Sequence, residues 1–490
     1  MRMMKLRIAD WGFRISLCLA LFGALAFGQI PEPGPAKSVN VPAVKETKLK
    51  NGLTVAVVEK HSSPIVTVQL LIKAGASMEG MEKAGLANIT ADMLTKGTKT
   101  RSAEQIAEEM EFLGTSINTG AGWNSSSVSM TVTTDKIGQA MAVMSDVVLN
   151  PTFKQEELDL LKSQSLDELQ SAMTQPSFLA SYVGSVYSLK EHPAGGTPAS
   201  LGSMSRDDVS GFYARVYSPD SSVLIFTGDV TSAQAASLAA KLFGKWGMPR
   251  PTDNVTYSAE SSPTPPKQRG EIANRILVVD LPKSGQASVN YFKSIDSFGR
   301  SGNRYYTAAV LNSLLGGGYS SRLNQEIRIK RGLSYGAGSS FGWRGSSTNF
   351  TTRTQTKNQS AAEVAELVIA ELRRLAETDA VETELNPRRL VLTGNFGRNL
   401  ETTAGLASAI GDLYTFSIAT TELNNYMPNI NGVTPVGVKG FATEYLRNGD
   451  LIIVGDYSIF KDDLAKRFPS IKVDVIPASE LDITKPNLRK

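Results

Sequence analysis

The sequence predicts an α+β fold built from two homologous domains, each an antiparallel-rich β-sheet covered by helices. Three observations support this prediction. The expected order of strands and helices occurs twice, and each half ends on an apolar strand stopped by Gly-Asp, VLIFTGD at 223–229 and LIIVGD at 451–456. A stretch rich in Pro and Ser at 249–270 separates two pieces of similar length. Helices and hairpins in runs, without strict βαβ alternation, favour α+β layers.

The chain has 490 residues, enough for two domains with sizeable cores. We therefore expect an N-terminal domain over 44–248, a linker over 249–270 and a C-terminal domain over 271–478. Of its residues, 41% are hydrophobic and 20% charged, which argues against a disordered chain and against a multi-span membrane protein.

The first half shows these elements in order: a strand over 66–72, a helix over 85–94, a second helix, strand-like segments over 115–120 and 125–133, and an amphipathic helix. The second helix begins with Ser102 and Gln105 at the spacing of a capping box. The apolar face of the amphipathic helix holds Ile137, Ala140, Met141, Met144 and Val148.

The second half repeats this order: a strand over 287–292, helices over 305–315 and 321–330, strands within 333–341 and 348–356, and an amphipathic helix. Ser360 and Glu363 predict a cap at the start of this last helix. Its apolar face holds Val364, Ala365, Val368, Leu372 and Leu375. The repeated order indicates a duplication.

The N-terminus has the pattern of an export signal. Four basic residues precede or flank the start of an apolar run over 15–26 that is too short for a permanent membrane span. Cleavage after Ala26 or before Gln29 would start the mature chain at Phe27 or Gln29, so we expect a signal peptide over 1–28 and a Pro-rich tether over 29–43. Cys18 lacks the small preceding residue of a lipidation site. These features predict a periplasmic or secreted protein.

Loss of residues 1–28 would also remove most of the basic character. Four basic and one acidic side chain would go, which lowers the formal net charge from +4 to +1. The sequence contains no basic stripe with interleaved aromatic residues, so nucleic acid is not an expected partner. The single cysteine lies in the signal, which excludes disulfides and thiolate metal sites in the mature chain.

Four segments carry a resemblance to a known family: LKNGLTVAVVEKHSSPIVTVQLLIKAGA (49–76), GLANITADMLTKGT (85–98), EHPAGGTPASL (191–201) and LLGGGYSSRLNQEIRIKRGLSYG (314–336). With them the sequence resembles the insulinase/pitrilysin zinc metallopeptidases, in the branch of mitochondrial processing peptidase, from residue 49 to about 475. Active members carry H-x-x-E-H in the segment matching 85–98, where imidazoles at i and i+4 grip one Zn²⁺ and the glutamate polarises its water.

The zinc motif is degenerate in this chain. The matching positions hold Asn88, Ala91 and Asp92, and the loose match to the third ligand is Glu168. An amide and two carboxylates would suit a hard ion better than zinc, and the general base would still be missing. The alternative is that Asn88 and Asp92 form a polar helix face. We expect no catalytic residue and no bound metal in this chain.

Few other residues are candidates for metal or nucleotide binding. Only two histidines exist, His61 before a strand and His192 in a loop, and both are expected to be ordinary loop residues. Glycines 316–318 are not followed by the Lys-Ser/Thr of a phosphate loop, and the family has a flexible glycine turn here.

The second half keeps a different family feature. The family places an arginine and a tyrosine, seven residues apart, against the substrate backbone beside the zinc, and the matches here are Arg328 and Tyr335. Both side chains donate hydrogen bonds to a carbonyl oxygen that gains negative charge during attack. On spacing alone, Arg328 would be a solvated helix residue and Tyr335 a core aromatic.

The resemblance implies a function by division of labour. In two-subunit bacterial members, one subunit carries the zinc motif and the other the arginine–tyrosine pair. We therefore expect a non-catalytic subunit of an exported zinc endopeptidase heterodimer, with zinc in the partner and extended or unfolded peptides as substrates. The alternative is a non-enzymatic peptide-binding or scaffold protein of the cell envelope, and a cryptic metallopeptidase is the weakest alternative.

Overall fold

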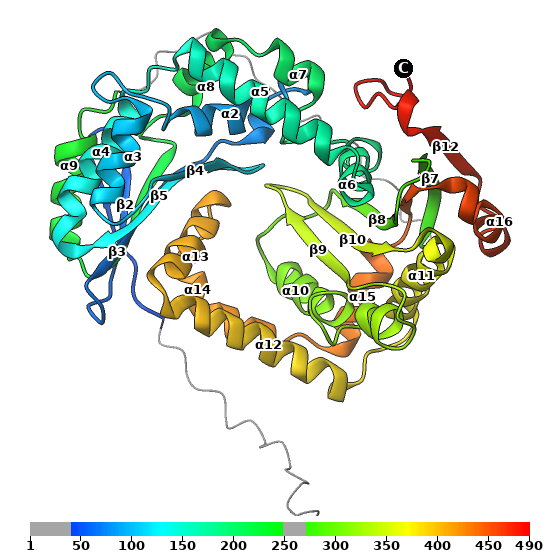
Figure 1. Cartoon of the computed structure of the whole chain (residues 1–490). Helices are drawn as coiled ribbons and strands as arrows, with labels where there is room; N and C mark the ends of the chain where they lie inside the picture. Colours follow the sequence, from blue (N-terminus) through cyan, green and yellow to red (C-terminus); the bar gives the residue numbers. More distant parts are fainter. Residues whose placement is uncertain (1–40, 248–270) are drawn as a thin grey trace, which may run out of the picture. The chain divides into compact units, whose positions relative to one another are not determined.

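The computed structural model describes residues 41–247 and 271–490. The predicted signal, most of the tether and the linker lie outside the described residues. Within them, each half of the chain forms one six-stranded sheet with helices (Figure 1). Among the helices of these two ranges, none combines the length and the apolar character that a membrane span requires.

The first sheet has the strand order β1-β2-β6-β3-β5-β4. Only β2 and β6 pair in parallel; the other neighbours are antiparallel. The apolar run before Gly228 forms β6, which is buried along its whole length. The strands are β1 Lys45–Lys48, β2 Thr54–Glu59, β3 Ile65–Ile72, β4 Asn118–Ala121, β5 Ser126–Thr133 and β6 Ser222–Gly228.

The helices of the first half agree with the sequence pattern. The predicted capping box is present, because the Ser102 hydroxyl accepts from Gln105 N and the Gln105 side chain accepts from Ser102 N. On α4, four residues of the predicted apolar face are buried and Ile137 is half-buried. The helices are α2 Leu86–Met93, α3 Ala103–Phe112, α4 Ile137–Leu149, α5 Gln155–Ala172, α6 Pro176–Tyr187, α7 Pro198–Ser203, α8 Arg206–Val216 and α9 Ser232–Phe243.

The second sheet repeats the first in five of its strands. Its order is β12-β7-β11-β8-β10-β9, so β7, β11, β8, β10 and β9 take the places of β2, β6, β3, β5 and β4. The sixth strand differs: β1 precedes its sheet in sequence and is antiparallel to β2, whereas β12 follows and is parallel to β7. The strands are β7 Ala273–Asp280, β8 Ala287–Ile295, β9 Ala337–Trp343, β10 Thr348–Thr356, β11 Gly449–Gly455 and β12 Val473–Pro477.

Two details of the second half differ from expectation. Ser360 precedes α11 but its side chain forms no capping hydrogen bond, because a 3₁₀ turn (Asn358–Ser360) already gives Ser360 helical backbone angles. The helix expected over 321–330 is π-helical at Asn324–Ile329 (η4). The α-helices are α10 Asn303–Leu315, α11 Ala361–Glu377, α12 Glu382–Glu401, α13 Thr403–Thr415, α14 Glu422–Asn431, α15 Pro435–Tyr445 and α16 Tyr457–Arg467.

The two halves exchange a helix. Helix α6 of the first half packs on β8 and β11, where a Cβ on Gly184 would lie 2.3 Å from the ring of Phe292. Helix α13 of the second half packs on β3 and β6. Its first residue, Thr403, accepts from the Thr67 hydroxyl at 2.9 Å through its own hydroxyl and from Thr227 at 2.8 Å through its carbonyl oxygen. Each sheet therefore has a helix from the other half of the chain packed against it.

The C-terminal residues after 478 also belong to the packed structure. Leu481, Ile483 and Leu488 are buried in the same apolar cluster as α6 and the facing side of the second sheet. A β-bridge between Leu481 and Arg489 closes this segment. The predicted class, two α+β units with mixed but mainly antiparallel sheets, is thus confirmed.

Candidate functional site

Helix α2 carries the degenerate metal motif, and a buried carboxylate supports its start. Gly85 at the N-cap has a left-handed backbone (φ 92°) and cannot supply a capping side chain. Instead Glu79 accepts from Gly85 N at 2.7 Å and from Ala87 N at 2.6 Å. Burial raises the pKa of this carboxyl to about 8, although the backbone N–H groups oppose the shift.

Asn88 connects three elements through its amide. Its nitrogen donates to Ala194 O at 2.8 Å, in the loop before α7, and its oxygen accepts from Ala121 N on β4 at 3.3 Å. Ala91, one turn on, is fully buried and has no polar atom in its side chain. The amide at the first histidine position is therefore occupied in holding α2 against β4 and the 191–197 loop.

Asp92 and Glu168 come close enough to interact, from α2 and α5. The pKa of Asp92 is raised, first by burial and then by the charge of Glu168, while Lys96 opposes the shift. Within the described ranges, no group of three or more His, Cys, Asp or Glu residues has the arrangement of a metal site. Two carboxylates and an engaged amide do not fit the tetrahedral nitrogen-rich site of a catalytic zinc.

Both histidines have structural contacts. His61 Nδ1 lies 2.7 Å from Asp229 Oδ1, and this hydrogen bond raises the pKa of the exposed imidazole. His192 Nε2 donates to Ala76 O at 3.0 Å, and its Nδ1 lies 3.8 Å from Glu79 Oε1. Neither ring is grouped with the carboxylates of α2 and α5 into a metal site.

The loop that Asn88 contacts is also bound to the second half. Glu191 accepts hydrogen bonds from Nε and Nη2 of Arg344, each at 2.6 Å, and from Asn349 Nδ2 at 2.9 Å. The Arg344 guanidinium also lies over the Trp123 ring, 4.8 Å from its centroid. The hairpin of β9 and β10 is thereby attached to the segment beside the degenerate motif.

Arg328 lies in the π-helix η4, and its side chain packs over an aromatic ring. Its guanidinium sits 4.9 Å from the ring centroid of Tyr319, which is 64% exposed. It makes no hydrogen bond or ion pair with any residue in the described ranges, so its N–H donors are open to a ligand. A guanidinium held over an aromatic face keeps its charge while losing some conformational freedom.

Tyr335 lies after a tight turn that follows η4. Gly332 N donates to Arg328 O at 3.0 Å and Leu333 N donates to Ile327 O at 2.9 Å, which folds the chain back toward β9. Tyr335 is 90% exposed, so the expectation of a core aromatic from spacing alone does not hold. The hydroxyl is free to donate.

The Asn324 amide on η4 connects this helix to the segments that hold Tyr319 and Tyr335. Asn324 Nδ2 donates to Gly318 O at 3.0 Å, next to Tyr319, and Asn324 Oδ1 accepts from Ala337 N at 2.9 Å, two residues after Tyr335. Asn324 is itself one turn before Arg328 on η4. Sequence reasoning missed Tyr319 and Asn324; the signals were an aromatic directly after Gly316–Gly318 and an amide four residues before the arginine.

Two models of one peptidase family match this chain. Residues 54–186 match the family model for insulinase (peptidase family M16), and residues 203–388 match the model for the peptidase M16 inactive domain. An "uncharacterized zinc protease" of Rickettsia bellii is 28% identical over 376 residues, which are 75% of this chain and 86% of that protein.

Solved structures share the fold. The peptidase M16 inactive domain from Pseudomonas fluorescens aligns over 84% of this chain and 98% of its own, with a TM-score of 0.74 and 23% identity. The periplasmic protease PqqL from Escherichia coli aligns over 90% of this chain and 52% of its own, with a TM-score of 0.67 and 15% identity. The matched models, the relatives and the doubled sheet together show that the chain belongs to the insulinase (M16) peptidase family.

Proposed function

We propose that this chain is the non-catalytic subunit of an exported insulinase-family zinc endopeptidase, and that it acts as a heterodimer with a zinc-bearing homologue. The observation that carries the proposal is an asymmetry between the two family sites. At the metal position the Asn88 amide has both polar atoms engaged. At the substrate position the Arg328 side chain makes no hydrogen bond to a residue in the described ranges, and Tyr335 is 90% exposed.

In the heterodimer, Arg328 and Tyr335 donate hydrogen bonds to the carbonyl oxygen of an extended peptide. The zinc of the partner supplies a bound water whose pKa is near 7. Donors placed where negative charge develops stabilise the transition state more than the bound substrate, so they raise turnover. Tyr319 keeps the Arg328 guanidinium in one region, because the charge is attracted to the ring face.

The predicted export signal supports a periplasmic or secreted location. The basic start and the apolar run over 15–26 have the order of a signal peptide. One structural neighbour, PqqL, is a periplasmic protease by name.

A peptide-binding scaffold without a peptidase partner is the second candidate. It is favoured by the exposure of Tyr319 and Tyr335, since exposed tyrosines suit peptide contacts with or without chemistry. A metallopeptidase acting alone is opposed by Ala91, whose methyl group accepts no proton.

Reconstitution tests the proposal. The purified chain from residue 29 should contain no stoichiometric zinc and should not cleave an unstructured peptide. Mixed or co-expressed with an H-x-x-E-H homologue from the same organism, it should form a complex that cleaves the peptide faster than either chain. A homologue with Gln in place of its motif glutamate is the matched control. Zinc and chelator-sensitive cleavage in the isolated chain would refute the proposal, and a complex without a rate gain would favour the scaffold.

A further inference from the structure

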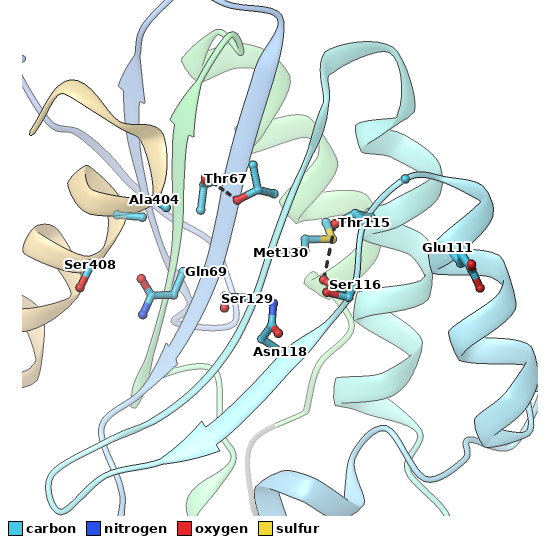
Figure 2. A pocket seen from close by; sticks show the side chains of 13 residues that line it. Thr67, Gln69, Glu111, Thr115, Ser116, Asn118, Ser129, Met130, Ala404 and Ser408 are labelled. Atoms are coloured by element: carbon cyan, nitrogen blue, oxygen red, sulfur yellow. Dashed lines mark hydrogen bonds between the residues drawn. The ribbon is translucent and has the colours of Figure 1, made fainter. Parts of the chain in front are cut away.

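Two cavities of the described residues differ in the charges that line them. The larger, of about 680 Å³, lies against β3 and β5, and its lining holds one ionisable side chain, the exposed Glu111 (Figure 2). The smaller, of about 320 Å³, lies in the second half and is lined by one charge of each sign, Arg300 and Glu422. A pair of opposite charges restricts the ligand more than neutral groups do, because a ligand must complement both.

The walls of the smaller cavity come mainly from the start of α10 and from one side of α14. The two helices pack against each other. On α14 the lining residues Glu422, Asn425 and Asn429 are three and four residues apart, so they share one face of the helix. Tyr306, in the first turn of α10, faces them through its hydroxyl, which donates to Glu422. The polar face of α14 therefore lines this cavity.

The positive side of the cavity combines a buried guanidinium with the start of a helix. The Arg300 side chain is 8% exposed, its Nε donates to Asp412 Oδ2 at 3.0 Å, and its Cζ lies 3.4 Å from the ring centroid of Tyr305. Its Nη1 and Nη2 make no hydrogen bond to a residue in the described ranges, which leaves four N–H donors for a ligand. Helix α10 begins without a side-chain cap, because Gly302 is its N-cap. The uncapped first turn also favours an anion.

The negative side is a carboxylate that is held in place. Glu422 Oε1 accepts from the Tyr306 hydroxyl, and Oε2 accepts from Asn425 Nδ2 at 3.1 Å. Each oxygen has two lone pairs, so both can accept a further hydrogen bond. Glu422 forms no ion pair within the described ranges, and Arg300 and Glu422 do not pair with each other although both line the cavity. This arrangement leaves room between the two charges for a ligand that carries both.

Charge and volume together define the class of ligand. An α-amino acid carries a carboxylate and an ammonium group on one carbon and so complements Arg300 and Glu422 at once. The volume lies at the lower end of the range of ligand pockets, which suits a small molecule. The lining also includes Ser301, Asn303 and Asn429, whose side chains make no hydrogen bond to a described residue. Their hydroxyl and amides both donate and accept, as an uncharged polar side chain of the ligand requires.

The cavity is separate from the proposed substrate surface. Helix α10 runs from Asn303 to Leu315 and is followed by Gly316–Gly318 and Tyr319. Its 13 residues span about 20 Å at 1.5 Å per residue. The cavity thus lies at the opposite end of this helix from the loop that leads to Tyr319 and Arg328.

We propose that this cavity binds a free α-amino acid with an uncharged polar side chain, of about the size of glutamine. Arg300 and the first turn of α10 bind its carboxylate, and Glu422 binds its ammonium group. This binding activity goes beyond the proposed peptidase subunit and does not depend on it, because all the residues of the site belong to one chain.

Isothermal titration calorimetry of the chain from residue 29 tests the site, with L-glutamine as the probe. One equivalent of L-glutamine should bind. N-acetyl-L-glutamine lacks the ammonium group and L-glutaminamide lacks the carboxylate. Each should bind at least about tenfold more weakly, because a hydrogen bond between charged groups contributes roughly a factor of ten or more. L-Glutamate and L-lysine should also bind more weakly than L-glutamine, because the cavity has no unused charge for their side chains.

A charge-neutral variant tests the role of Glu422. Glu422→Gln keeps the size of the side chain and should weaken L-glutamine about tenfold, but it should leave N-acetyl-L-glutamine unchanged, because that probe has no ammonium group. The matched control is Glu401→Gln, whose side chain is exposed and makes no hydrogen bond or ion pair to a described residue. Equal losses for both probes would contradict the assignment of Glu422.

A second variant keeps the test valid if Glu422→Gln folds poorly. Asn429→Trp fills the cavity from α14 and should abolish binding of L-glutamine, whereas Asn424→Trp, at an exposed position of the same helix, should not change it. The proposal is overturned if the wild type binds none of these amino acids at millimolar concentration. It is also overturned if N-acetyl-L-glutamine binds as tightly as L-glutamine, since the site would then recognise a carboxylate alone.

Discussion

Replacement of Asn88 by Ala should destabilise the protein, although the position matches a metal ligand in active relatives. The change removes two hydrogen bonds, to Ala194 O and from Ala121 N, that join α2 to a loop and to an edge strand. A net contribution of about 1 kcal/mol for each bond predicts a loss of about 2 kcal/mol in the free energy of unfolding.

The expected shift in melting temperature follows from chain length. At roughly 2.1 cal/mol/K per residue, the entropy of unfolding of a chain of about 450 residues is roughly 0.9 kcal/mol/K, so Tm should fall by about 2 °C. Differential scanning fluorimetry and urea unfolding both measure the effect. The control is Asn424→Ala, whose side chain is exposed on α14 and makes no hydrogen bond to a described residue.

The outcome distinguishes a structural amide from a vestigial metal ligand. The loss of stability should be the same with and without added zinc or EDTA. A Tm equal to that of Asn424→Ala would refute the assignment of Asn88 as a connector. A Tm of the wild type that rises with zinc and falls with EDTA would refute the conclusion that α2 has no metal function.

Two further predictions concern buried charged groups, and a third concerns the export signal. Burial raises the pKa of Glu79 from 4.5 to about 8, so the folded state disfavours the ionised form. The free energy of unfolding should therefore fall by up to about 1.4 kcal/mol per pH unit as pH rises from 4.5 to 8. Urea unfolding of Glu79→Gln should show a flatter dependence of this free energy on pH. Arg344→Met leaves the largely buried carboxylate of Glu191 without its guanidinium and should cost about 2–3 kcal/mol by urea unfolding, whereas Arg373→Met, from an exposed pair with Glu271, should cost under about 0.5 kcal/mol. N-terminal sequencing of the native protein should give Phe27 or Gln29 as the first residue. An intact Met1 in a cytoplasmic fraction would contradict the export signal.

Much of the fold was predictable from local pattern. Alternation placed β3 and β5, helical periodicity placed α4 and α11, and the repeated Gly-Asp ends marked β6 and β11 as equivalent strands. These signals are local because side-chain periodicity and capping act within a few residues. The predicted capping hydrogen bond of Ser360 is absent, because a 3₁₀ turn before the helix gives Ser360 helical backbone angles that a capping residue does not have.

The exchange of α6 and α13 between the halves was not predictable. Each helix has an apolar face that any sheet could cover, and only long-range packing decides which one does. The packing depends on close contacts of Gly184 with Phe292 and of Thr403 with Thr67. Neither Gly184 nor Thr403 lies in a distinctive sequence pattern.

The candidate site was predictable only where a family motif is intact. Arg328 and Tyr335 were found by their spacing within a longer match. Tyr319 and Asn324 act through contacts of the folded chain, a cation–π interaction and two backbone hydrogen bonds, which sequence spacing alone does not reveal. The structural use of Asn88 likewise depends on β4 and the 191–197 loop, which are distant in sequence.

The most direct test of the central claim is the steady-state kinetics of the pair formed with a zinc-bearing homologue, with Tyr335→Phe and Arg328→Ala in this chain. Tyr335→Phe removes one exposed hydroxyl and leaves the ring, so folding and assembly should be unchanged. Loss of a donor to the developing charge should lower kcat by about 10²–10³ with a smaller change in KM. Unchanged kcat and KM in both variants would contradict the account and leave this chain as a scaffold.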